Sequence, residues 1–251
     1  MPKLFDTHCH LDVEPLSLDL RGVLDRAWKA GVRRILIPAI HGPIVDPGFP
    51  ENVWRAWGVH PGICDEIQPE AIRPLFDLRN YNARAIGECG LDVHADIPIE
   101  HQSEIFIRQL EIAETSGLPV LVHLRGAWDK GLSLLRAHAR NVPWVMHSFC
   151  GSWEIAEGFL REGAFLSFSG SLCMPQARKT PRVARLAPSD RILLETDAPD
   201  MKPNDWPGQN SEPAALPLIA RCLAGLRQVS VEELASRISE TCEKIWVEPI
   251  K

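Results

Sequence analysis

The sequence predicts an α/β protein built as a (β/α)8 barrel of the TIM type. Eight short apolar runs alternate along the 251 residues with longer segments of helical periodicity. The runs are continuously apolar, as expected of parallel strands that are buried on both faces. No low-complexity linker and no internal repeat divides the chain, so we expect a single domain over residues 1–251.

The predicted strands are the apolar runs themselves. They lie at residues 3–8, 33–40, 53–60, 83–88, 119–123, 142–147, 164–168 and 191–197. In a barrel of this kind, the carboxyl ends of all the strands open on one rim, where active sites are built.

Helices are predicted between the strands, where apolar residues recur three and four positions apart. A first helix includes Leu20, Val23, Leu24 and Ala27, and a long helix around 105–113 is ended by Gly117 and Pro119. Further helices are expected at 69–79, 128–140, 152–162, 176–187, 213–227 and 231–245, and Ser230 with Glu233 forms a capping box at the start of the last one.

One segment departs from this alternation of strand and helix. Residues 41–52 carry three prolines in the place of the helix that should follow the second strand. Proline lacks a backbone N–H and interrupts helices, so we expect this second helix to be reduced to a loop. Without this helix, apolar surface of the barrel would be exposed and could serve as a dimer contact. We therefore expect a monomer or a weak homodimer.

The composition is typical of a folded protein with a mildly acidic surface. Lys and Arg number 27 against 33 Asp and Glu, a net charge of −6 that argues against a broad basic groove for long nucleic acid. A local phosphate site remains open, because bound metal ions supply positive charge. The seven cysteines show no C-x-x-C spacing, and neither a signal peptide nor a membrane span is visible, so we expect a reduced, cytoplasmic protein.

The ends of the predicted strands carry the residues that bear on chemistry. Imidazoles and carboxylates close six of them, and they should converge on one rim of the barrel. Four of these imidazoles, together with two of the carboxylates, suit a divalent metal ion. The other histidines, His41, His94, His101 and His138, are expected to be structural or surface residues. The residues at the strand ends are Asp6, His8, His10, His60, Glu88, His123, His147 and Asp197.

Six motifs in order resemble those of the TatD family of metal-dependent deoxyribonucleases, within the wider amidohydrolase-like barrels. The resemblance extends from residue 4 to about residue 246, and NSEP at 210–213 adds to it. The motifs are FDTHCHLD at 5–12, GVHPG at 58–62, AIGECGLD at 85–92, PVLVHLRGA at 119–127, MHSFCGS at 146–152 and ETDAP at 195–199.

The resemblance implies a centre of two divalent metal ions, which would be Mg, Mn or Zn. His8, His10, Glu88 and Asp197 would hold one ion, and Glu88 would bridge to a second ion held by His123 and His147. The bridging role agrees with chemistry, since a carboxylate has two oxygens with which to contact two ions.

The resemblance also implies roles in catalysis. Asp197 would act as general base on a water molecule, Glu88 would support catalysis as the bridge, and Glu195 would orient a ligand imidazole. Asp6, Asp12 and Asp92 would either orient other groups or cap loops.

Two residues are expected to contact a substrate phosphate. His60 would hydrogen-bond the substrate or stabilise the leaving group, and Arg125 would either grip a phosphate oxygen or form a salt bridge across the rim. Among the loop aromatics, at most one is expected to stack on a base, and the rest to serve packing. These aromatics are Trp128, Phe149, Trp153 and Trp206.

The expected function is therefore that of a metal-dependent hydrolase of phosphodiester bonds, acting as a 3′→5′ exodeoxyribonuclease on single-stranded DNA. One alternative keeps the site but changes the bond, as in an ester or amide hydrolase such as a D-aminoacyl-tRNA deacylase. A second alternative is a metal-binding module for partner recognition without turnover. The partners expected are DNA or another phosphoester.

Overall fold

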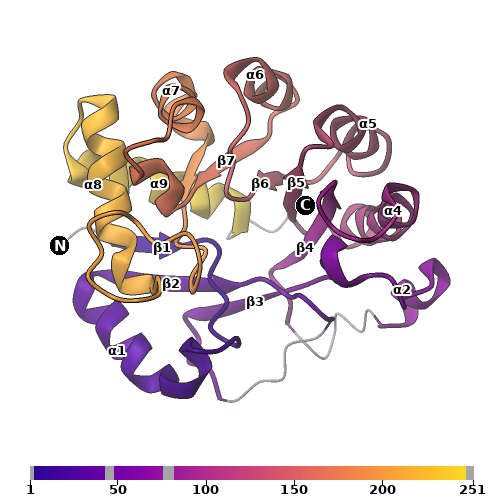
Figure 1. Ribbon diagram of the computed structural model, residues 1–251, viewed down its shortest axis with the longest axis horizontal. Helices are drawn as coiled ribbons and strands as arrows, with labels where there is room; N and C mark the ends of the chain where they lie inside the picture. Colours follow the sequence, from indigo (N-terminus) through magenta and orange to yellow (C-terminus); the bar gives the residue numbers. More distant parts are fainter. Residues whose placement is uncertain (1–2, 43–47, 76–81, 247–251) are drawn as a thin grey trace.

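The computed structural model describes residues 3–42, 48–75 and 82–246. Within this part of the chain, eight parallel strands pair in chain order to form a barrel, as predicted (Figure 1). Each connection leads from one strand to its neighbour in the sheet. The strands are β1 (Leu4–Asp6), β2 (Val32–Ile37), β3 (Val53–Trp57), β4 (Ala85–Asp92), β5 (Val120–Arg125), β6 (Trp144–Met146), β7 (Phe165–Phe168) and β8 (Ile192–Leu194).

The barrel is nearly closed between its last and first strands. The backbone N–H of Thr7 donates to the carbonyl of Leu194 over 3.1 Å. Just beyond the strand ends, Cys9 and Ala198 form a parallel bridge. These contacts bring the residues that follow β1 beside the residues that follow β8.

Helices surround the strands, at the positions that the apolar spacing predicts. The long helix α4 ends at Gly117 in the left-handed conformation (φ 70°), and the Ser230 hydroxyl accepts a hydrogen bond from the Glu233 N–H, as a capping box requires. The helices are α1 (Leu20–Ala30), α2 (Pro69–Leu75), α4 (Ile99–Ser116), α5 (Trp128–His138), α6 (Trp153–Arg161), α7 (Lys179–Leu186), α8 (Leu216–Arg227) and α9 (Val231–Trp246).

Two predictions on helices fall partly on residues that are not described. Between β2 and β3, the described residues 41–42 and 48–52 contain no helix, in agreement with the predicted loop, and 43–47 lie outside the description. The predicted helix at 69–79 is present as α2, and positions 76–79 lie outside the described residues.

Several strand ends were predicted wrongly. The strand expected at 191–197 ends at Leu194, and the one expected at 53–60 ends at Trp57, whereas β4 continues beyond 88 to Asp92. Asp197 adopts a left-handed conformation (φ 54°), which no strand accommodates, so the strand cannot extend to the predicted end at 197. Apolar content alone therefore does not fix the last residue of a strand that ends in polar side chains.

The core fills the barrel and the space between strands and helices. The side chains of Ile35, Leu36 and Ile37 in β2 are all buried, as predicted for strands covered on both faces. Burial of each such side chain is worth about 1.5–3 kcal/mol. At the chain end, Trp246 of α9 packs on Phe5 of β1 with ring centroids 5.1 Å apart.

Among the described residues, no single helix has the length and hydropathy needed to span a bilayer. Residues 213–227 and 231–246 meet these criteria only as a pair, bent by 105°.

A glycine sets the approach of β4 to β5. Gly90 has φ 152°, and a Cβ atom there would overlap the carbonyl oxygen of His123 in β5. We predict that Gly90→Ala lowers the free energy of unfolding by about 3 kcal/mol or more, because backbone atoms cannot yield to the new methyl group. Urea denaturation followed by circular dichroism measures this change.

A matched control uses a glycine with free space around it. Gly225 lies within α8, and a methyl group added there would meet no atom outside its own helix turn. Gly225→Ala should therefore raise stability by about 0.5–1 kcal/mol. Equal effects of the two substitutions would contradict the assigned role of Gly90.

Candidate metal centre

The carboxyl ends of the strands bring the predicted residues together around one carboxylate. Glu88 of β4 is 3% exposed, and imidazoles from several different chain segments lie within 4 Å of its oxygens. These imidazoles belong to His8, His10, His60, His123 and His147.

One oxygen of Glu88 faces the histidines that follow β1. The Nε2 atoms of His8 and His10 lie 3.1 and 3.7 Å from Glu88 Oε2. The same two nitrogen atoms lie 3.8 Å from Oδ1 of Asp197. Two imidazoles and two carboxylates thus enclose a small space, as the predicted first metal site requires.

The other oxygen of Glu88 faces a different set of rings. His123 Nδ1 lies 2.7 Å from Glu88 Oε1, His147 Nε2 lies 3.2 Å from it, and His60 Nε2 lies 3.5 Å from it. Glu88 therefore presents one oxygen to each of two groups of imidazoles. This is the arrangement in which a single carboxylate contacts two cations.

The grouping differs in one respect from the expected ligand sets. His147 stacks on His8 with ring centroids 3.7 Å apart, and ligand atoms of His8, His147 and Asp197 lie within 4.8 Å of one another. The other two such groups are His8 with His10 and Glu88, and His60 with Glu88 and His123. His147 is thus grouped with ligands of the first predicted site rather than with His123.

Burial and the neighbouring carboxylates shift the pKa values of the rings in opposite directions. Burial lowers the pKa of His10 to about 3, so this ring is neutral at pH 7 and has a free lone pair. Burial acts in the same direction on His147, but the charges of nearby carboxylates, above all Glu88, raise the pKa of this ring. Protons on such rings balance the same buried negative charge that a divalent cation would balance.

A second layer of carboxylates holds two of the rings. The Glu195 carboxylate lies 3.0 Å from His147 Nδ1 and accepts the Ser148 N–H over 2.6 Å. Asp92 lies 3.3 Å from His123 Nε2, and this hydrogen bond contributes most to lowering the pKa of Asp92 to about 2. Each contact fixes a ring so that its other nitrogen faces Glu88.

Asp6 acts on the backbone rather than on a ring. Its buried carboxylate accepts hydrogen bonds from the Thr196 N–H over 2.8 Å and from the Thr196 hydroxyl over 2.6 Å. The next residue, Asp197, donates its N–H to the His8 carbonyl over 2.9 Å. Asp6 thereby positions the turn that carries Asp197. Asp12, expected to play a similar role, is exposed.

The tautomer of His60 follows from a backbone contact. The Gly62 N–H donates to His60 Nδ1 over 3.0 Å, and a backbone N–H is only a donor. Burial lowers the pKa of His60 to about 4, so the ring is neutral and its single proton lies on Nε2. His60 therefore presents an N–H donor to the site, which fits a substrate contact better than a metal ligand.

The remaining candidates lie around the mouth. Arg125 has a side chain 60% exposed, and its guanidinium lies 4.0 Å from Asp92. Phe149 is fully buried and offers no open platform for a base, and the half-buried Trp128 packs against it with ring centroids 5.5 Å apart. Trp206 donates its indole N–H to the Asn210 carbonyl over 3.0 Å, and Trp153 is half-buried.

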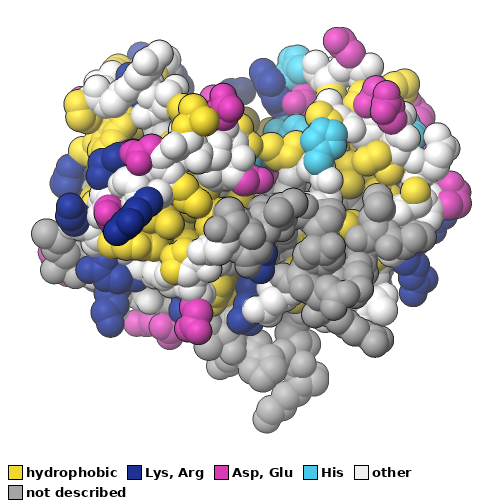
Figure 2. All heavy atoms as spheres, turned by 90° about the horizontal axis from the view of Figure 1, so that it is seen from below, with side chains coloured by type: hydrophobic (Ala, Val, Ile, Leu, Met, Phe, Trp, Pro, Cys, Tyr) yellow, Lys and Arg dark blue, Asp and Glu magenta, His cyan; other side chains and the backbone are white. Residues whose placement is uncertain are grey.

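The four histidines expected to be structural stay outside the cluster. His101 contacts the Cys64 carbonyl over 2.8 Å, and His138 lies 4.0 Å from Glu111. The backbone N–H of His94 donates to Asp92 over 2.8 Å, but neither His41 nor His94 belongs to a candidate metal-ligand group among the described residues. The face in Figure 2 shows acidic and basic side chains interspersed, with histidines near its upper edge.

Two residues of the site region were missed from the sequence. Gln109 in α4 is fully buried, accepts the Val59 N–H over 2.7 Å and donates to the Val59 carbonyl over 3.1 Å. Seven residues earlier, Gln102 makes the same pair of contacts with Asp92 at 2.8 and 3.0 Å. The two glutamines thus hold the backbone next to His60 and at Asp92. Their spacing of two helical turns on an apolar face was the available signal.

The donor set fits divalent metal ions. The grouped oxygen and nitrogen ligand atoms lie within 4.8 Å of one another, and the buried carboxylates require positive charge nearby. Imidazole with carboxylate suits Zn, Mn and related ions.

We predict that Gln109→Leu lowers the free energy of unfolding by about 2–4 kcal/mol, because it leaves both backbone groups of Val59 buried without partners. Chemical denaturation measures this change. The exposed Gln176 provides the control, since Gln176→Leu should change stability by less than about 0.5 kcal/mol. A small effect at both positions would show that the Gln109 contacts do not hold the backbone.

Comparisons with known proteins agree with this geometry. The family model described as "TatD related DNase" matches residues 5–247. A Bacillus subtilis protein named uncharacterized metal-dependent hydrolase YabD is 32% identical, over 97% of this chain and 98% of its own. The Erwinia billingiae protein named 3′-5′ ssDNA/RNA exonuclease TatD is also 32% identical, over 97% of this chain and 98% of its own. The crystal structure of the Escherichia coli TatD homologue YjjV superposes with a TM-score of 0.89 at 32% identity, over 98% of both chains. The chain therefore belongs to the family of TatD-related DNases and is a metal-dependent hydrolase.

Proposed function

We propose that this hydrolase removes nucleotides from the 3′ end of single-stranded DNA with the help of two divalent metal ions. The observation that carries the proposal is the position of Glu88, whose two oxygens face two groups of imidazoles at the mouth of the barrel. The name of the Erwinia billingiae relative, a 3′-5′ ssDNA/RNA exonuclease, supports the choice of substrate and polarity.

The residues that would hold the ions are those grouped around Glu88. His8, His10 and Asp197 lie on the side of Oε2, and His123 and His147 lie on the side of Oε1. When bound there, Mg, Mn or Zn ions would supply Lewis acidity toward a phosphoryl oxygen and lower the pKa of a coordinated water molecule.

Three side chains would act on the substrate and the attacking water. Asp197 would accept the proton of the water molecule that attacks phosphorus, since its carboxylate lies at the mouth beside the two histidines that follow β1. Attack forms a new P–O bond, and the bond from phosphorus to the 3′ oxygen of the remaining strand breaks. His60 would donate a hydrogen bond from Nε2–H to that leaving oxygen, and the proton that Asp197 accepted would pass to this oxygen. Arg125 would pair with a non-bridging phosphate oxygen.

The distribution of charge favours a strand end over a long duplex as the substrate. The chain has a net charge of −6, and the face in Figure 2 carries no continuous basic stripe among its described residues. One exposed guanidinium, that of Arg125, lies beside the site near Asp92. Such a site suits recognition of a terminal nucleotide. Cytoplasmic location, a single domain over residues 1–251 and a monomeric or weakly dimeric state remain predictions.

The direct test is digestion of single-stranded DNA oligonucleotides by the metal-loaded protein. With a 3′ label, labelled mononucleotide should appear first, whereas a 5′ label should stay on progressively shorter strands. We predict that Asp197→Asn retains the fold and loses activity by about 100-fold or more, because the proton acceptor is removed. Asp190→Asn, an exposed change on the short helix before β8, is the control.

Other outcomes of the digestion would contradict the proposal. Release of label first from the 5′ end would reverse the polarity. Cleavage of D-aminoacyl-tRNA without cleavage of DNA or RNA would favour the ester hydrolase instead.

The role of Arg125 is tested by steady-state kinetics. We predict that Arg125→Gln raises KM for single-stranded DNA about tenfold with a smaller change in kcat, because a charged hydrogen bond to the phosphate is lost. Arg108→Gln, a change of an exposed arginine on α4 that pairs with Glu111, should leave KM unchanged. If KM is unchanged in both variants, Arg125 serves only the salt bridge to Asp92.

A further inference from the structure

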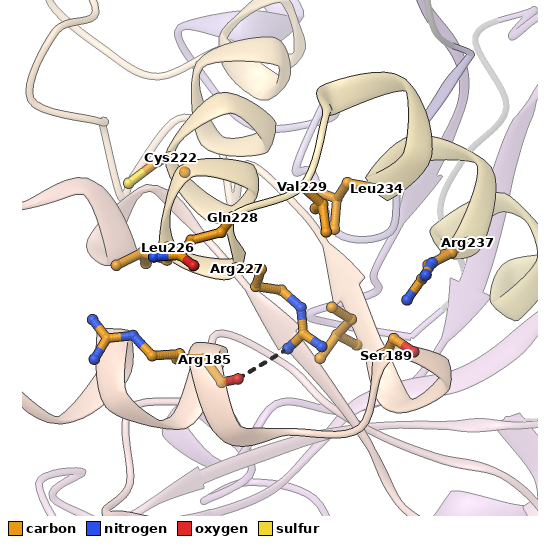
Figure 3. Close-up of a pocket in the computed structure, with 11 residues that line it drawn as sticks. Arg185, Ser189, Cys222, Leu226, Arg227, Gln228, Val229, Leu234 and Arg237 are labelled. Atoms are coloured by element: carbon orange, nitrogen blue, oxygen red, sulfur yellow. Dashed lines mark hydrogen bonds between the residues drawn. The ribbon is translucent and has the colours of Figure 1, made fainter.

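A second cavity lies far from the metal centre, in the groove between α7, α8 and α9 (Figure 3). It has a volume of about 720 Å³, within the range of small-ligand sites. Its floor includes Ile192, the first residue of β8, whereas Asp197 follows the opposite end of that strand. The length of β8 therefore separates the cavity from the residues of the metal centre. The cavity is therefore distinct from the proposed active site.

The charged side chains that line this cavity are all arginines. They are Arg185 of α7, Arg227 of α8 and Arg237 of α9. Glu233 pairs with Arg237 over 2.6 Å, and no other ion pair of these arginines is present among the described residues. Together, the three guanidinium groups and this one carboxylate leave two positive charges uncompensated.

Arg227 is held in place by contacts that do not neutralise it. Its NH1 atom donates to the carbonyls of Ala184 and Ala187, both over 2.8 Å, at the end of α7. Burial and the nearby charge of Arg237 lower the pKa of Arg227. Figure 3 shows its guanidinium beside Ser189, between Arg185 on the left and Arg237 on the right. A guanidinium fixed on one side in this way presents its remaining N–H groups for an anion at little entropic cost.

The wall beside the arginines is apolar. Val229 and Leu234 line the cavity with Ile192, and Gln228 adopts a left-handed conformation (φ 57°) at the turn between α8 and α9. A ligand that fills this space therefore meets guanidinium groups and a hydroxyl on one side and aliphatic side chains on the other.

We propose that this groove binds a phosphate monoester carried on a weakly polar body, such as a nucleoside monophosphate. The excess of two positive charges over the whole lining favours a dianionic phosphate monoester over a singly charged carboxylate. The phosphate would lie between Arg227 and Arg237 near the Ser189 hydroxyl, with the body against Val229 and Leu234. The inference does not depend on the hydrolase having DNA as its substrate.

Isothermal titration calorimetry of the full chain with dAMP tests the proposal. The titration is run in EDTA, so that phosphate binding by metal ions is excluded. We expect saturable binding of one dAMP per chain, no binding of adenosine, and about tenfold weaker binding of inorganic phosphate, which lacks the apolar body. Arg237→Gln should weaken dAMP binding about tenfold.

The control is the same substitution, arginine to glutamine, at a position outside the cavity. Arg161 of α6 forms an i,i+4 pair with Glu157, as Arg237 does with Glu233, so Arg161→Gln should leave dAMP binding unchanged. Both arginines are exposed, and circular dichroism verifies the fold of each variant. Absence of saturable binding, equal loss in both variants, an unchanged affinity in Arg237→Gln, or equal affinity for phosphate and dAMP would each overturn the proposal.

Discussion

The buried carboxylate of Glu88 is the constraint around which the rest of the structure is arranged. Removing a carboxylate from water costs several kcal/mol unless charge or hydrogen bonds compensate it. In this chain, imidazoles on both carboxylate oxygens provide that compensation. Burial alone would raise the pKa of Glu88, but the imidazoles hold this pKa well below its usual range. Only a fold that gathers the ends of several strands at one point supplies so many partners from distant parts of the sequence.

The residues around the centre are themselves held by buried polar contacts. Glu195 and Asp92 fix the rings of His147 and His123, and Asp6 fixes the turn that carries Asp197. The glutamines of α4 act one layer further out, on the backbone beneath the site. Such contacts stabilise the barrel rim in one geometry, which keeps the candidate metal ligands close together.

Much of the fold and of the site could be predicted from the sequence. Buried parallel strands have a continuous apolar signature, and polar residues at their ends mark the rim, so the gathering of His8, Glu88 and His147 followed from the barrel alone. The exact strand ends did not follow, because the left-handed turn at Asp197 is a local backbone feature without an apolar signal. The tautomer of His60 depends on a contact with the Gly62 backbone, which only coordinates reveal.

The central claim is that Glu88 joins two cations, one on each side of its carboxylate. The most direct test is an anomalous difference map from a crystal of this protein grown with Mn²⁺. The account predicts two peaks, one beside His8 and His10 and the other beside His123, with the Glu88 carboxylate between them. A single peak, or peaks remote from Glu88, would contradict it.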